Sequence, residues 1–294
     1  MPHVTLIVNP RATAVDERRI ALVEQALARH ADVVVERTQD RGHAMELARG
    51  AEDADAIFVF SGDGGFNEVV NGLGPNSPPL GCIPGGGTSV FPRVLGIPAD
   101  PVPAAEHLVR SLVEHRFRTI TLGRVNGRRF LFSAGIRLDA ELVRRLERGR
   151  SRDGRPGDAA AVAALAKVVA EQHGRFGPAL EADGLGRVAF LLVANADPYT
   201  YLGSIPVHIA PEATLEGGLD VVAAIRLDGR HIPGLLRYML TGRRKPRFVL
   251  TRHDVDRIEA RCDEPLPLQA DGEDLGDVTE AVFEAERGAL TVLS

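Results

Sequence analysis

The sequence is poor in cysteine, with only Cys82 and Cys262 among 294 residues. Both stand in apolar surroundings, which is typical of buried free thiols. They provide neither a disulfide framework nor a CxxC metal site. The nine histidines are scattered and lack the paired spacing of a zinc-binding helix. This composition favours a reducing, cytoplasmic compartment.

Long apolar runs and a basic surplus are also missing. No apolar run reaches membrane-spanning length, and the N-terminal MPHVTLIVNP has no basic region before its apolar stretch, so it is expected to be a first strand and not a signal peptide. The net charge is −5, whereas nucleic-acid binders normally carry a basic surplus. Because 44% of the residues are hydrophobic and 26% are charged, the chain can bury a sizeable core. We therefore expect a folded protein with no nucleic-acid partner.

Strand-like and helix-like segments alternate along the first part of the chain. Buried strands are expected at 4–8, 32–38, 56–60 and 79–83, and helices at 16–31, 43–51, 67–73, 88–96 and 103–115. Alternation of this kind predicts a doubly wound parallel sheet with helices on both faces. Ligands bind such sheets at the carboxyl ends of the strands. In the 88–96 helix we expect Ser89 at the N-cap, which leaves Pro92 in the first turn, where it is tolerated.

The pattern changes near residue 117. Asn126-Gly127 lies between two strand-like runs, which is a strong hairpin signal. Helical stretches follow at 139–149 and 157–172, separated by a loop at 151–158, and the remainder is rich in antiparallel-type strands. We predict a boundary at about residue 120, with an α/β domain over 1–120 and a β-rich domain over 121–285.

Two glycine-rich turns, SGDGG and PGGGTS, each follow a buried strand and precede a helix. One such turn could be no more than a tight bend, but two together favour an anion site built from backbone N–H groups and helix N-termini. The Walker motif and the GxGxxG fingerprint are both absent. Asp63 would repel phosphates unless a Mg²⁺ ion stood between them, which points to a nucleoside triphosphate and phosphoryl transfer.

The motifs resemble those of one known family in content and order. NPRA, SGDGGFNEVVNGL and GCIPGGGTSVFPRVLGIP resemble NPxSG, GGDGTxNEVxNG and PxGTxNDFAR of the diacylglycerol kinase catalytic family, which includes bacterial lipid kinases and the sphingosine and ceramide kinases. SAGIRLDAELV, NADPYTYLGSIPVHIAPEATLEGGLDVV and LQADGE resemble its later segments. The resemblance implies a nucleotide-binding α/β domain, a following β-sandwich domain with the cleft between them, and a final segment, 286–294, that packs back onto the first domain.

The resemblance also implies roles for particular residues. Glu273, in the DGE motif, matches the general base that accepts the proton of a lipid hydroxyl, and Asp63 is the second expected catalytic carboxylate. The expected nucleotide contacts are Asn9, Pro10, Arg11, Thr38, Ser61, Gly62, Asp63, Gly64, Gly65, Asn67, Glu68 and Thr88. Ala213, Glu216 and Gly218 match a structural Mg²⁺ site made of two main-chain carbonyls and one carboxylate.

Several positions depart from the family pattern. Ser61 replaces a glycine, and Gly65 replaces a threonine, which removes one hydroxyl contact to phosphate. Ser89-Val90 replaces Asn-Asp, Thr121 replaces an aspartate, and Glu216 replaces an aspartate. These departures are compatible with a divergent kinase and with a homologue that binds nucleotide or lipid but transfers phosphate poorly.

The resemblance implies an ATP- and Mg²⁺-dependent kinase that phosphorylates a lipid hydroxyl, with diacylglycerol or a related lipid as acceptor. It is compatible with a homodimer and with peripheral contact at the inner face of the membrane. Arginines cluster at 141–156 and 241–247; solvated surface is the preferred interpretation and contact with anionic headgroups the alternative. An NAD kinase or a sugar-phosphate kinase is the competing enzyme class.

Overall fold

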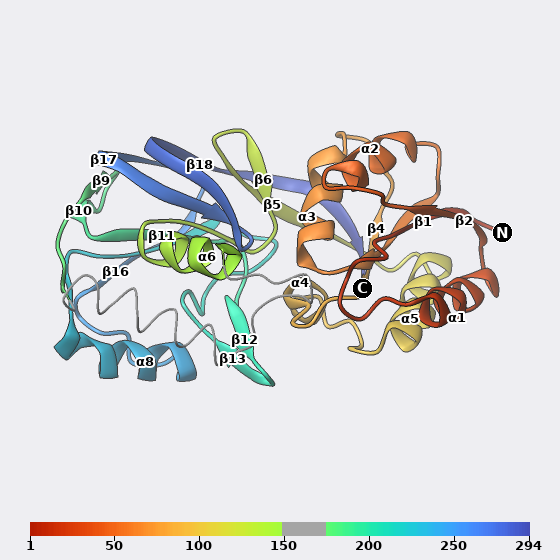
Figure 1. Ribbon diagram of the computed structural model, residues 1–294, viewed down its shortest axis with the longest axis horizontal. Helices are drawn as coiled ribbons and strands as arrows, with labels where there is room; N and C mark the ends of the chain where they lie inside the picture. Colours follow the sequence, from red (N-terminus) through yellow and green to blue (C-terminus); the bar gives the residue numbers. More distant parts are fainter. Residues whose placement is uncertain (149–174) are drawn as a thin grey trace. The chain divides into compact units, whose positions relative to one another are not determined.

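The computed structural model describes residues 1–148 and 175–294 (Figure 1). The chain divides into two compact units, one of residues 1–120 with 288–294 and one of residues 121–287. The division therefore falls between Ile120 and Thr121, beside the boundary expected at residue 120. The helix expected at 157–172, the loop at 151–158 and residues 149–156 of the 141–156 arginine cluster lie outside the described residues.

Unit 1 is built on a parallel sheet. Its strands are β1 (His3–Val8), β2 (Asp32–Arg37), β3 (Ala56–Ser61) and β4 (Leu80–Pro84), in the spatial order β4-β3-β1-β2. The order reverses between β1 and β3, which is the point where doubly wound sheets bind ligands. β3 and β4 are buried along their whole length, as both faces of a parallel sheet must be covered.

The end of the chain belongs to the same sheet. The last residues of β18 (Glu273–Leu293) pair in parallel with β4, with Val292 opposite Leu80. The hydroxyl of Ser111 donates to the carbonyl of Ser294 at 2.9 Å. This is the return of the C-terminal segment that the resemblance implied.

Two pairs of helices cover the two faces of this sheet. α1 (Glu17–Ala28) packs with α5 (Pro101–Val113), and α2 (His43–Gly50) packs with α3 (Asp63–Gly72), as the ribbon shows on opposite sides of the strands (Figure 1). Each of α1 and α5 begins at an aspartate that accepts a backbone N–H of the first turn, at 2.8 Å for Asp16 and 3.0 Å for Asp100. Such caps satisfy donors that a helix leaves unpaired at its start.

The start of α3 differs from the prediction. We expected a glycine loop up to residue 66 and a helix from Asn67, but the helix begins at Asp63, with Gly62 in extended conformation at its N-cap. A carboxylate in the first turn is favourable beside the positive end of the helix dipole. Ser61 therefore ends β3, and the residues from Asp63 to Gly65 form the first turn of α3 and not a loop that precedes it.

Unit 2 is dominated by antiparallel strands. Its main sheet has the order β16-β14-β11-β7-β17-β18. The strands are β5 (Phe117–Val125), β6 (Arg128–Phe130), β7 (Ser133–Ile136), β9 (Leu180–Ala182), β10 (Gly186–Val188), β11 (Phe190–Ala194), β14 (Leu219–Ala224), β16 (Val249–Val255) and β17 (Arg257–Ala270), with β18 as given above. Asn126 and Gly127 both have positive φ, 47° and 87°, and connect β5 to β6 as the predicted hairpin turn.

Short elements complete unit 2. β8 (Arg175–Phe176) pairs with β15 (Leu227–Asp228), and β12 (Thr200–Leu202) pairs with β13 (Ile205–Val207). The helices are α6 (Leu138–Arg148), the short 3-10 turn η1 (Gly229–His231) and α8 (Ile232–Thr241). No helix among the described residues is long and apolar enough to cross a bilayer.

The main sheet of unit 2 is apolar on both faces. Along β11, Leu191 and Val193 belong to one buried cluster while Leu192 and Ala194 belong to another, because successive side chains alternate between the faces. Leu235 and Met239 of α8 pack against the second cluster. The predicted fold class, an α/β unit followed by a β-sandwich unit, is confirmed.

Candidate active site

The two glycine turns of unit 1 meet. The N–H of Gly85 donates to the carbonyl of Ser61 at 2.7 Å. A Cβ atom added to Gly86 would lie 2.9 Å from the Cα of Gly62, closer than real Cβ contacts allow. The approach of the two backbones therefore requires glycine at position 86. Two turns that are 24 residues apart in the sequence form one surface at the carboxyl ends of β3 and β4.

The ends of β1 and β2 reach the same edge of the sheet. Asn9 donates its N–H to the carbonyl of Phe60 at 3.0 Å and accepts the N–H of Arg11 on its side-chain oxygen at 3.0 Å. The N–H of Thr38 donates to the carbonyl of Val8 at 2.9 Å. The structure thus places Asn9, Pro10, Arg11 and Thr38 at the same edge of the sheet as the first glycine turn.

Asp63 has a structural role that the sequence did not indicate. Its side chain is buried, with 4% exposure, and its two oxygens accept the N–H groups of Val90 and Phe91, each at 3.0 Å. Asp63 therefore caps α4 (Val90–Val94) from another part of the chain. The carboxylate that was expected to face Mg²⁺ thus also holds two backbone donors in place.

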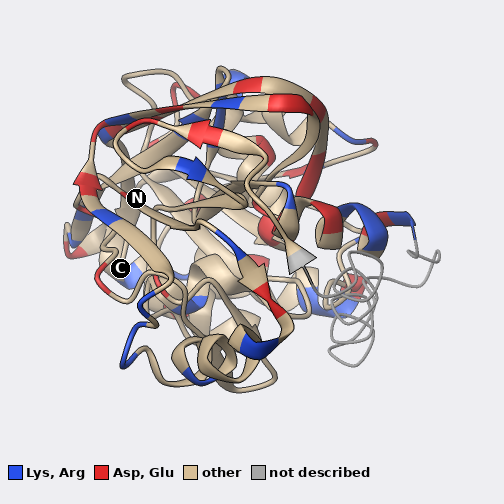
Figure 2. Cartoon of the chain, turned by 90° about the vertical axis from the view of Figure 1, so that its left-hand side faces the viewer, with Lys and Arg blue, Asp and Glu red and all other residues tan. Residues whose placement is uncertain are grey.

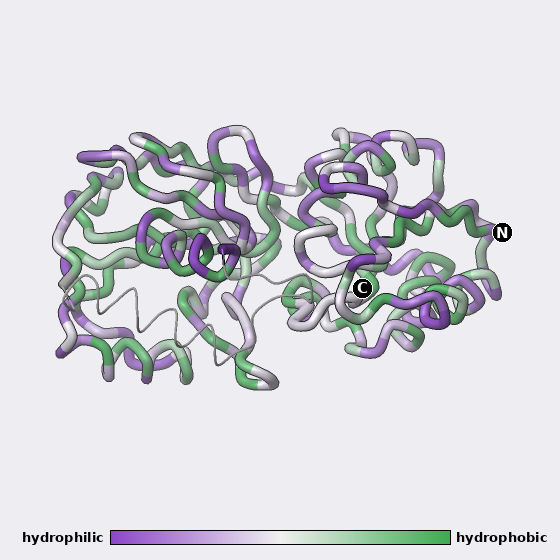
Figure 3. Tube along the Cα trace, in the orientation of Figure 1, coloured by the Kyte–Doolittle hydropathy of each residue, from purple (hydrophilic) through white to green (hydrophobic). Residues whose placement is uncertain are grey.

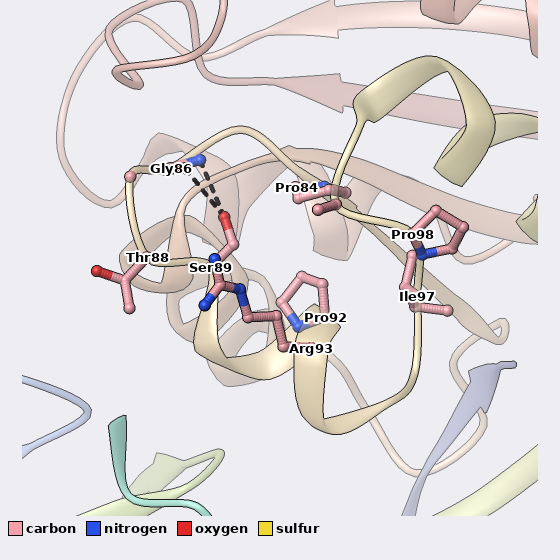
Figure 4. A pocket seen from close by; sticks show the side chains of 10 residues that line it. Pro84, Gly86, Thr88, Ser89, Pro92, Arg93, Ile97 and Pro98 are labelled. Carbon is pink, nitrogen blue, oxygen red and sulfur yellow. Dashed lines mark hydrogen bonds between the residues drawn. The ribbon is translucent and has the colours of Figure 1, made fainter. Parts of the chain in front are cut away.

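Ser89 lies where the sequence predicted it, but its side chain has another role. Ser89 does occupy the N-cap position of α4, and Pro92 lies in the first turn, but Ser89 has φ of 48° and its side chain makes no capping bond. Its hydroxyl folds back onto Gly86 (Figure 4). The two donors at the start of α4 are satisfied by Asp63, which frees Ser89 to stabilise the glycine turn.

Two other predicted nucleotide contacts lie within the helix layer. Asn67 is buried and its side-chain oxygen accepts from the amide of Asn71 at 3.2 Å. The carboxylate of Glu68 accepts the N–H of Gly42 at 3.0 Å, at the start of α2. The Glu68 contact joins α2 to α3, and the Asn67 contact lies within α3, so both side chains help to hold the helix that starts at the glycine turn.

Ser61 and Gly65 are spatial neighbours. A Cβ atom at Gly65 would lie 2.1 Å from the hydroxyl oxygen of Ser61. The serine side chain therefore occupies the space beside residue 65 that a threonine would fill. That hydroxyl is buried and has no hydrogen-bond partner among residues 1–148 and 175–294. The two departures from the family pattern therefore compensate for each other as one exchange. The hydroxyl that a threonine at position 65 would supply comes instead from Ser61 at the end of β3.

This exchange predicts a coupled pair of substitutions. Gly65→Thr alone should lower the free energy of unfolding by about 1–3 kcal/mol, because the new side chain overlaps Ser61. The double variant Ser61→Gly/Gly65→Thr should recover most of that loss, since the overlap is removed. Urea unfolding of the wild type, both single variants and the double variant measures the coupling. Simple additivity of the two single effects would contradict the exchange.

A small pocket lies beside the second glycine turn. It is lined by Pro84, Gly86, Gly87, Thr88, Ser89, Pro92, Arg93, Ile97, Pro98 and Ala99 (Figure 4). Thr88 was expected here, but Arg93 was not. The signal for Arg93 was present in the sequence, because it stands where the motif PxGTxNDFAR ends in arginine. A guanidinium suits a phosphate group, which it can contact through two parallel N–H donors.

In unit 2 the DGE motif forms a rigid turn between β17 and β18. Asp271 is buried and accepts the N–H groups of Leu131, Phe132 and Ser133 at 2.6, 3.0 and 3.2 Å. Glu273 follows two residues later, and its side chain keeps 26% exposure and pairs with Arg128. Asp271 thus fixes the turn, and the guanidinium of Arg128 contacts the predicted base.

A buried carboxylate supports the same turn. Gln269 accepts the N–H of Gly272 at 2.9 Å and donates its own amide to Asp139 of α6 at 2.7 Å. Burial raises the pKa of Asp139 to about 7, although the hydrogen bond from Gln269 opposes the rise. Asp139 and Gln269 were not among the expected site residues. The segment SAGIRLDAELV contained Asp139, but only the fold shows that it lies under the DGE turn.

Asp139 predicts a pH dependence of stability. Its pKa is raised in the folded protein, so the folded state retains a proton that the unfolded chain loses from about pH 4 upward. The stability contribution of Asp139 is complete at low pH and is lost as pH rises to about 7. Relative to Asp139→Asn, the wild type should lose about 1.4 kcal/mol of unfolding free energy per pH unit over this interval.

Urea unfolding between pH 5 and 8.5 would measure this difference, with the exposed Asp53→Asn as a matched control. We expect the two stability curves of wild type and Asp139→Asn to diverge up to about pH 7 and then to run parallel. Parallel curves over the whole range would show that Asp139 ionises normally.

The expected structural Mg²⁺ residues lie in one turn before β14. Ala213 is buried, Glu216 is exposed, and the N–H of Gly218 donates to Asp254 at 2.6 Å. No group of three or more His, Cys, Asp or Glu side chains placed to hold a metal occurs in the described part of the chain. Glu216 is therefore the one side-chain ligand in this predicted set.

Thr121, at the position of a family aspartate, is fully buried.

Two family models match most of the chain. The family described as the diacylglycerol kinase catalytic domain matches residues 3–125, and the YegS C-terminal NAD kinase beta sandwich-like domain matches residues 138–294. The chain is 42% identical over 99 residues to the diacylglycerol kinase of Bacillus subtilis (strain 168), which is 33% of this chain and 31% of that protein. It is 37% identical over 98 residues to that of Staphylococcus haemolyticus (strain JCSC1435), covering 32% of this chain and 28% of that protein. These matches span about a third of the relatives' length.

Solved structures share the fold over the whole chain. A crystal structure described as a diacylglycerol kinase from Bacillus anthracis str. Sterne has a TM-score of 0.74 and 23% identity, and covers 99% of this chain and 96% of that chain. An NAD kinase from Archaeoglobus fulgidus in complex with ATP has a TM-score of 0.54 and 14% identity, and covers 99% of this chain and 93% of that chain. The chain therefore consists of a domain of the diacylglycerol kinase catalytic family over residues 3–125, followed over residues 138–294 by a YegS C-terminal NAD kinase beta sandwich-like domain.

Proposed function

We propose that this protein is a lipid kinase that transfers the γ-phosphoryl group of ATP to a lipid hydroxyl, with diacylglycerol or a related lipid as acceptor. The observation that carries the proposal is the meeting of the two glycine turns at the strand ends of unit 1. Backbone groups that are not covered by side chains can approach a triphosphate closely. The relatives named diacylglycerol kinase support the choice of acceptor class.

The residues of unit 1 fit the phosphates of ATP. The hydroxyl of Ser61 is buried without a partner among the described residues, and Thr88 and Arg93 line the pocket beside the second turn. We propose that these groups, with the N–H groups of the turns, position the triphosphate. ATP supplies the phosphoryl group when it is bound. Positioning and charge neutralisation are the main protein contributions to such transfers.

Magnesium enters the proposal at two places. Both oxygens of Asp63 accept backbone N–H groups and each keeps a second lone pair, so we propose that Asp63 caps α4 while it faces the Mg²⁺ that accompanies ATP. We propose that Mg²⁺ binds with ATP through the phosphate oxygens, and that Ala213, Glu216 and Gly218 hold a second, structural Mg²⁺. The two sites are separable, since loss of the carboxylate in Glu216→Ala should affect only the structural one.

Glu273 is the proposed general base. A carboxylate beside the acceptor hydroxyl can take its proton as the O–P bond forms. Arg128 holds the Glu273 carboxylate in one orientation, and the cap made by Asp271 keeps the turn from moving. Asp139 and Gln269 support the turn from below and are positioning residues in this proposal.

An NAD kinase is the second candidate function. The likeness of the fold to an NAD kinase structure and the description of the C-terminal domain favour it. A sugar-phosphate kinase and a homologue with weak transfer activity remain competing outcomes of the same test. We further propose a cytoplasmic protein that contacts the inner face of the membrane and can form a homodimer.

The test uses purified protein, Mg²⁺ and γ-labelled ATP with diacylglycerol, ceramide or sphingosine in detergent micelles, beside NAD and fructose 6-phosphate. Label on a lipid, and none on the soluble acceptors, supports the lipid kinase. Label on NAD would contradict the lipid kinase and support the NAD kinase. ATP binding by calorimetry without label on any acceptor would identify a binding homologue and contradict the proposal.

A further inference from the structure

The outer side of α8 carries exposed leucines. Leu236 and Leu240 are 45% and 48% exposed, and their spacing of four residues places them on one stripe of the helix. Tyr238 on the inner side is buried, and its hydroxyl donates to the carbonyl of Ile209 at 3.0 Å. The inner side is thus anchored in unit 2, while the outer side presents apolar groups to solvent.

A third exposed apolar side chain lies on the element beside α8. The β12–β13 hairpin packs against α8, and Ile205 in this hairpin is 53% exposed. The N–H of His208, just after β13, donates to the carbonyl of Met239 at 2.6 Å. In Figure 3, green stretches, the colour of hydrophobic residues, alternate with pale and purple ones along α8. The large hydrophobic residues exposed in the described part of unit 2 all lie between positions 205 and 240.

The same region is strongly basic. Residues 225–247 contain seven arginine or lysine residues and a single aspartate, a formal charge of +6 in a chain whose net charge is −5. Arg237, Arg243 and Arg244 are exposed and form no ion pair with a carboxylate in the described ranges. Figure 2 shows more blue than red along its lower edge, the edge on which α8 lies in Figure 1. These guanidinium groups are available to an anionic partner.

We propose that this surface, formed by Ile205, Leu236, Arg237, Leu240, Arg243 and Arg244 and called here the α8 surface, docks the protein on an anionic lipid bilayer. Apolar side chains on a helix with basic neighbours are the combination that binds membrane interfaces, because the apolar groups enter the boundary of the acyl chains while the cations meet the headgroups. The inference deepens the proposed function by naming the surface that would bring a lipid kinase to its substrate.

Charge and side-chain type together favour a bilayer over nucleic acid. Both are anionic, but single-stranded nucleic acid is held by aromatic side chains on which bases stack, and the exposed apolar groups of this surface are aliphatic. Exposed leucine and isoleucine side chains gain favourable transfer free energy when they are buried in hydrocarbon, and they gain none from contact with a phosphate backbone. This revises the preferred interpretation of the 241–247 arginine cluster from solvated surface to headgroup contact.

The experiment measures vesicle binding directly and needs no catalysis. Wild-type protein is sedimented with vesicles of phosphatidylcholine and phosphatidylglycerol, and with vesicles of phosphatidylcholine alone. We expect binding to the anionic vesicles, weakened by salt as surface electrostatics requires. Leu236→Ser/Leu240→Ser and Arg243→Glu/Arg244→Glu should each lower the partition coefficient by about tenfold or more.

Matched controls come from unit 1. Leu22→Ser removes a leucine that is 40% exposed on α1, and Arg18→Glu/Arg110→Glu reverses two exposed arginines on α1 and α5. Both controls should bind vesicles as the wild type does. All variants should keep the wild-type melting temperature, because every substituted side chain is exposed. Equal losses in the controls would show that only overall charge or hydrophobicity matters and would overturn the assignment to α8.

The failure of this inference can be told apart from the failure of the proposed function. If the protein binds anionic vesicles through α8 but phosphorylates no lipid, the proposed docking surface stands and the proposed kinase activity is contradicted. A kinase active on micellar lipid whose vesicle binding is unchanged in both α8 variants would overturn the docking surface alone. A shift from dimer to monomer in Leu236→Ser/Leu240→Ser, with vesicle binding unchanged, would assign the surface to a second copy of the chain.

Discussion

Glu273→Gln is expected to lower kcat for lipid phosphorylation by about 10²–10⁴-fold, the usual contribution of a general base. Glutamine has the same shape but cannot take the proton of the acceptor hydroxyl. The KM for ATP should stay within about twofold, because the predicted nucleotide contacts lie in unit 1 and an interaction made only in the transition state changes kcat alone. Steady-state kinetics with labelled ATP measures both quantities.

The control for Glu273→Gln is Glu280→Gln, an exposed glutamate on the same strand. This variant should keep wild-type kinetics. Because Glu273 pairs with Arg128, the unfolding free energy of both variants is measured as well, so that a damaged fold is not mistaken for lost catalysis. Full activity in a folded Glu273→Gln protein would remove Glu273 from the role of base.

Asp63→Ala is expected to lower the free energy of unfolding by about 2–5 kcal/mol, even in the absence of Mg²⁺ and nucleotide. Two buried N–H groups, those of Val90 and Phe91, would lose their acceptor, and each unsatisfied buried donor costs about 1–3 kcal/mol. α4 would lose its cap, and the adjacent glycine turn would lose its anchor. ATP affinity should therefore fall together with stability.

This prediction separates the two roles considered for Asp63. A residue that only holds Mg²⁺ would leave the unliganded protein as stable as the wild type when it is replaced. A residue that caps α4 would destabilise it without any ligand. Asp100→Ala is the matched control, because Asp100 caps α5 from an exposed position and its loss should cost about 1 kcal/mol. Urea unfolding of metal-free protein decides between the roles.

Much of the fold could be predicted from local patterns. Buried strands such as Ala56–Ser61 are continuous apolar runs, and the alternation of these runs with helical periodicity leaves few arrangements other than a parallel sheet. The Asn126-Gly127 hairpin was predictable because few residues other than asparagine and glycine adopt two successive positive φ angles. The start of α3 was missed because glycine in SGDGG suggests a loop, whereas the carboxylate of Asp63 stabilises a helix from its first turn.

The candidate site was predictable in its motifs but not in its contacts. The order of SGDGG, PGGGTS and DGE along the chain indicated the family, and Glu273 and the glycine turns follow from it. The partners of Asp63, the exchange between Ser61 and Gly65, and the support of the DGE turn by Asp139 all join residues that are distant in the sequence or that look unrelated. Local periodicity carries no information about which side chain satisfies which donor.

The sequence by itself determined the layered α/β unit, the strand-rich second unit and the place of the two glycine turns after buried strands, because each depends on residue types within a short window. The tertiary structure alone decided that Asp63 caps α4, that Asp139 is buried beneath Gln269, and that Leu236 and Leu240 face solvent beside basic residues. Burial and hydrogen-bond partners are set by packing between distant segments. The sequence alone therefore does not show whether a carboxylate binds a ligand or caps a helix, or whether a leucine is buried or exposed. The neighbours that the fold brings to each residue decide this.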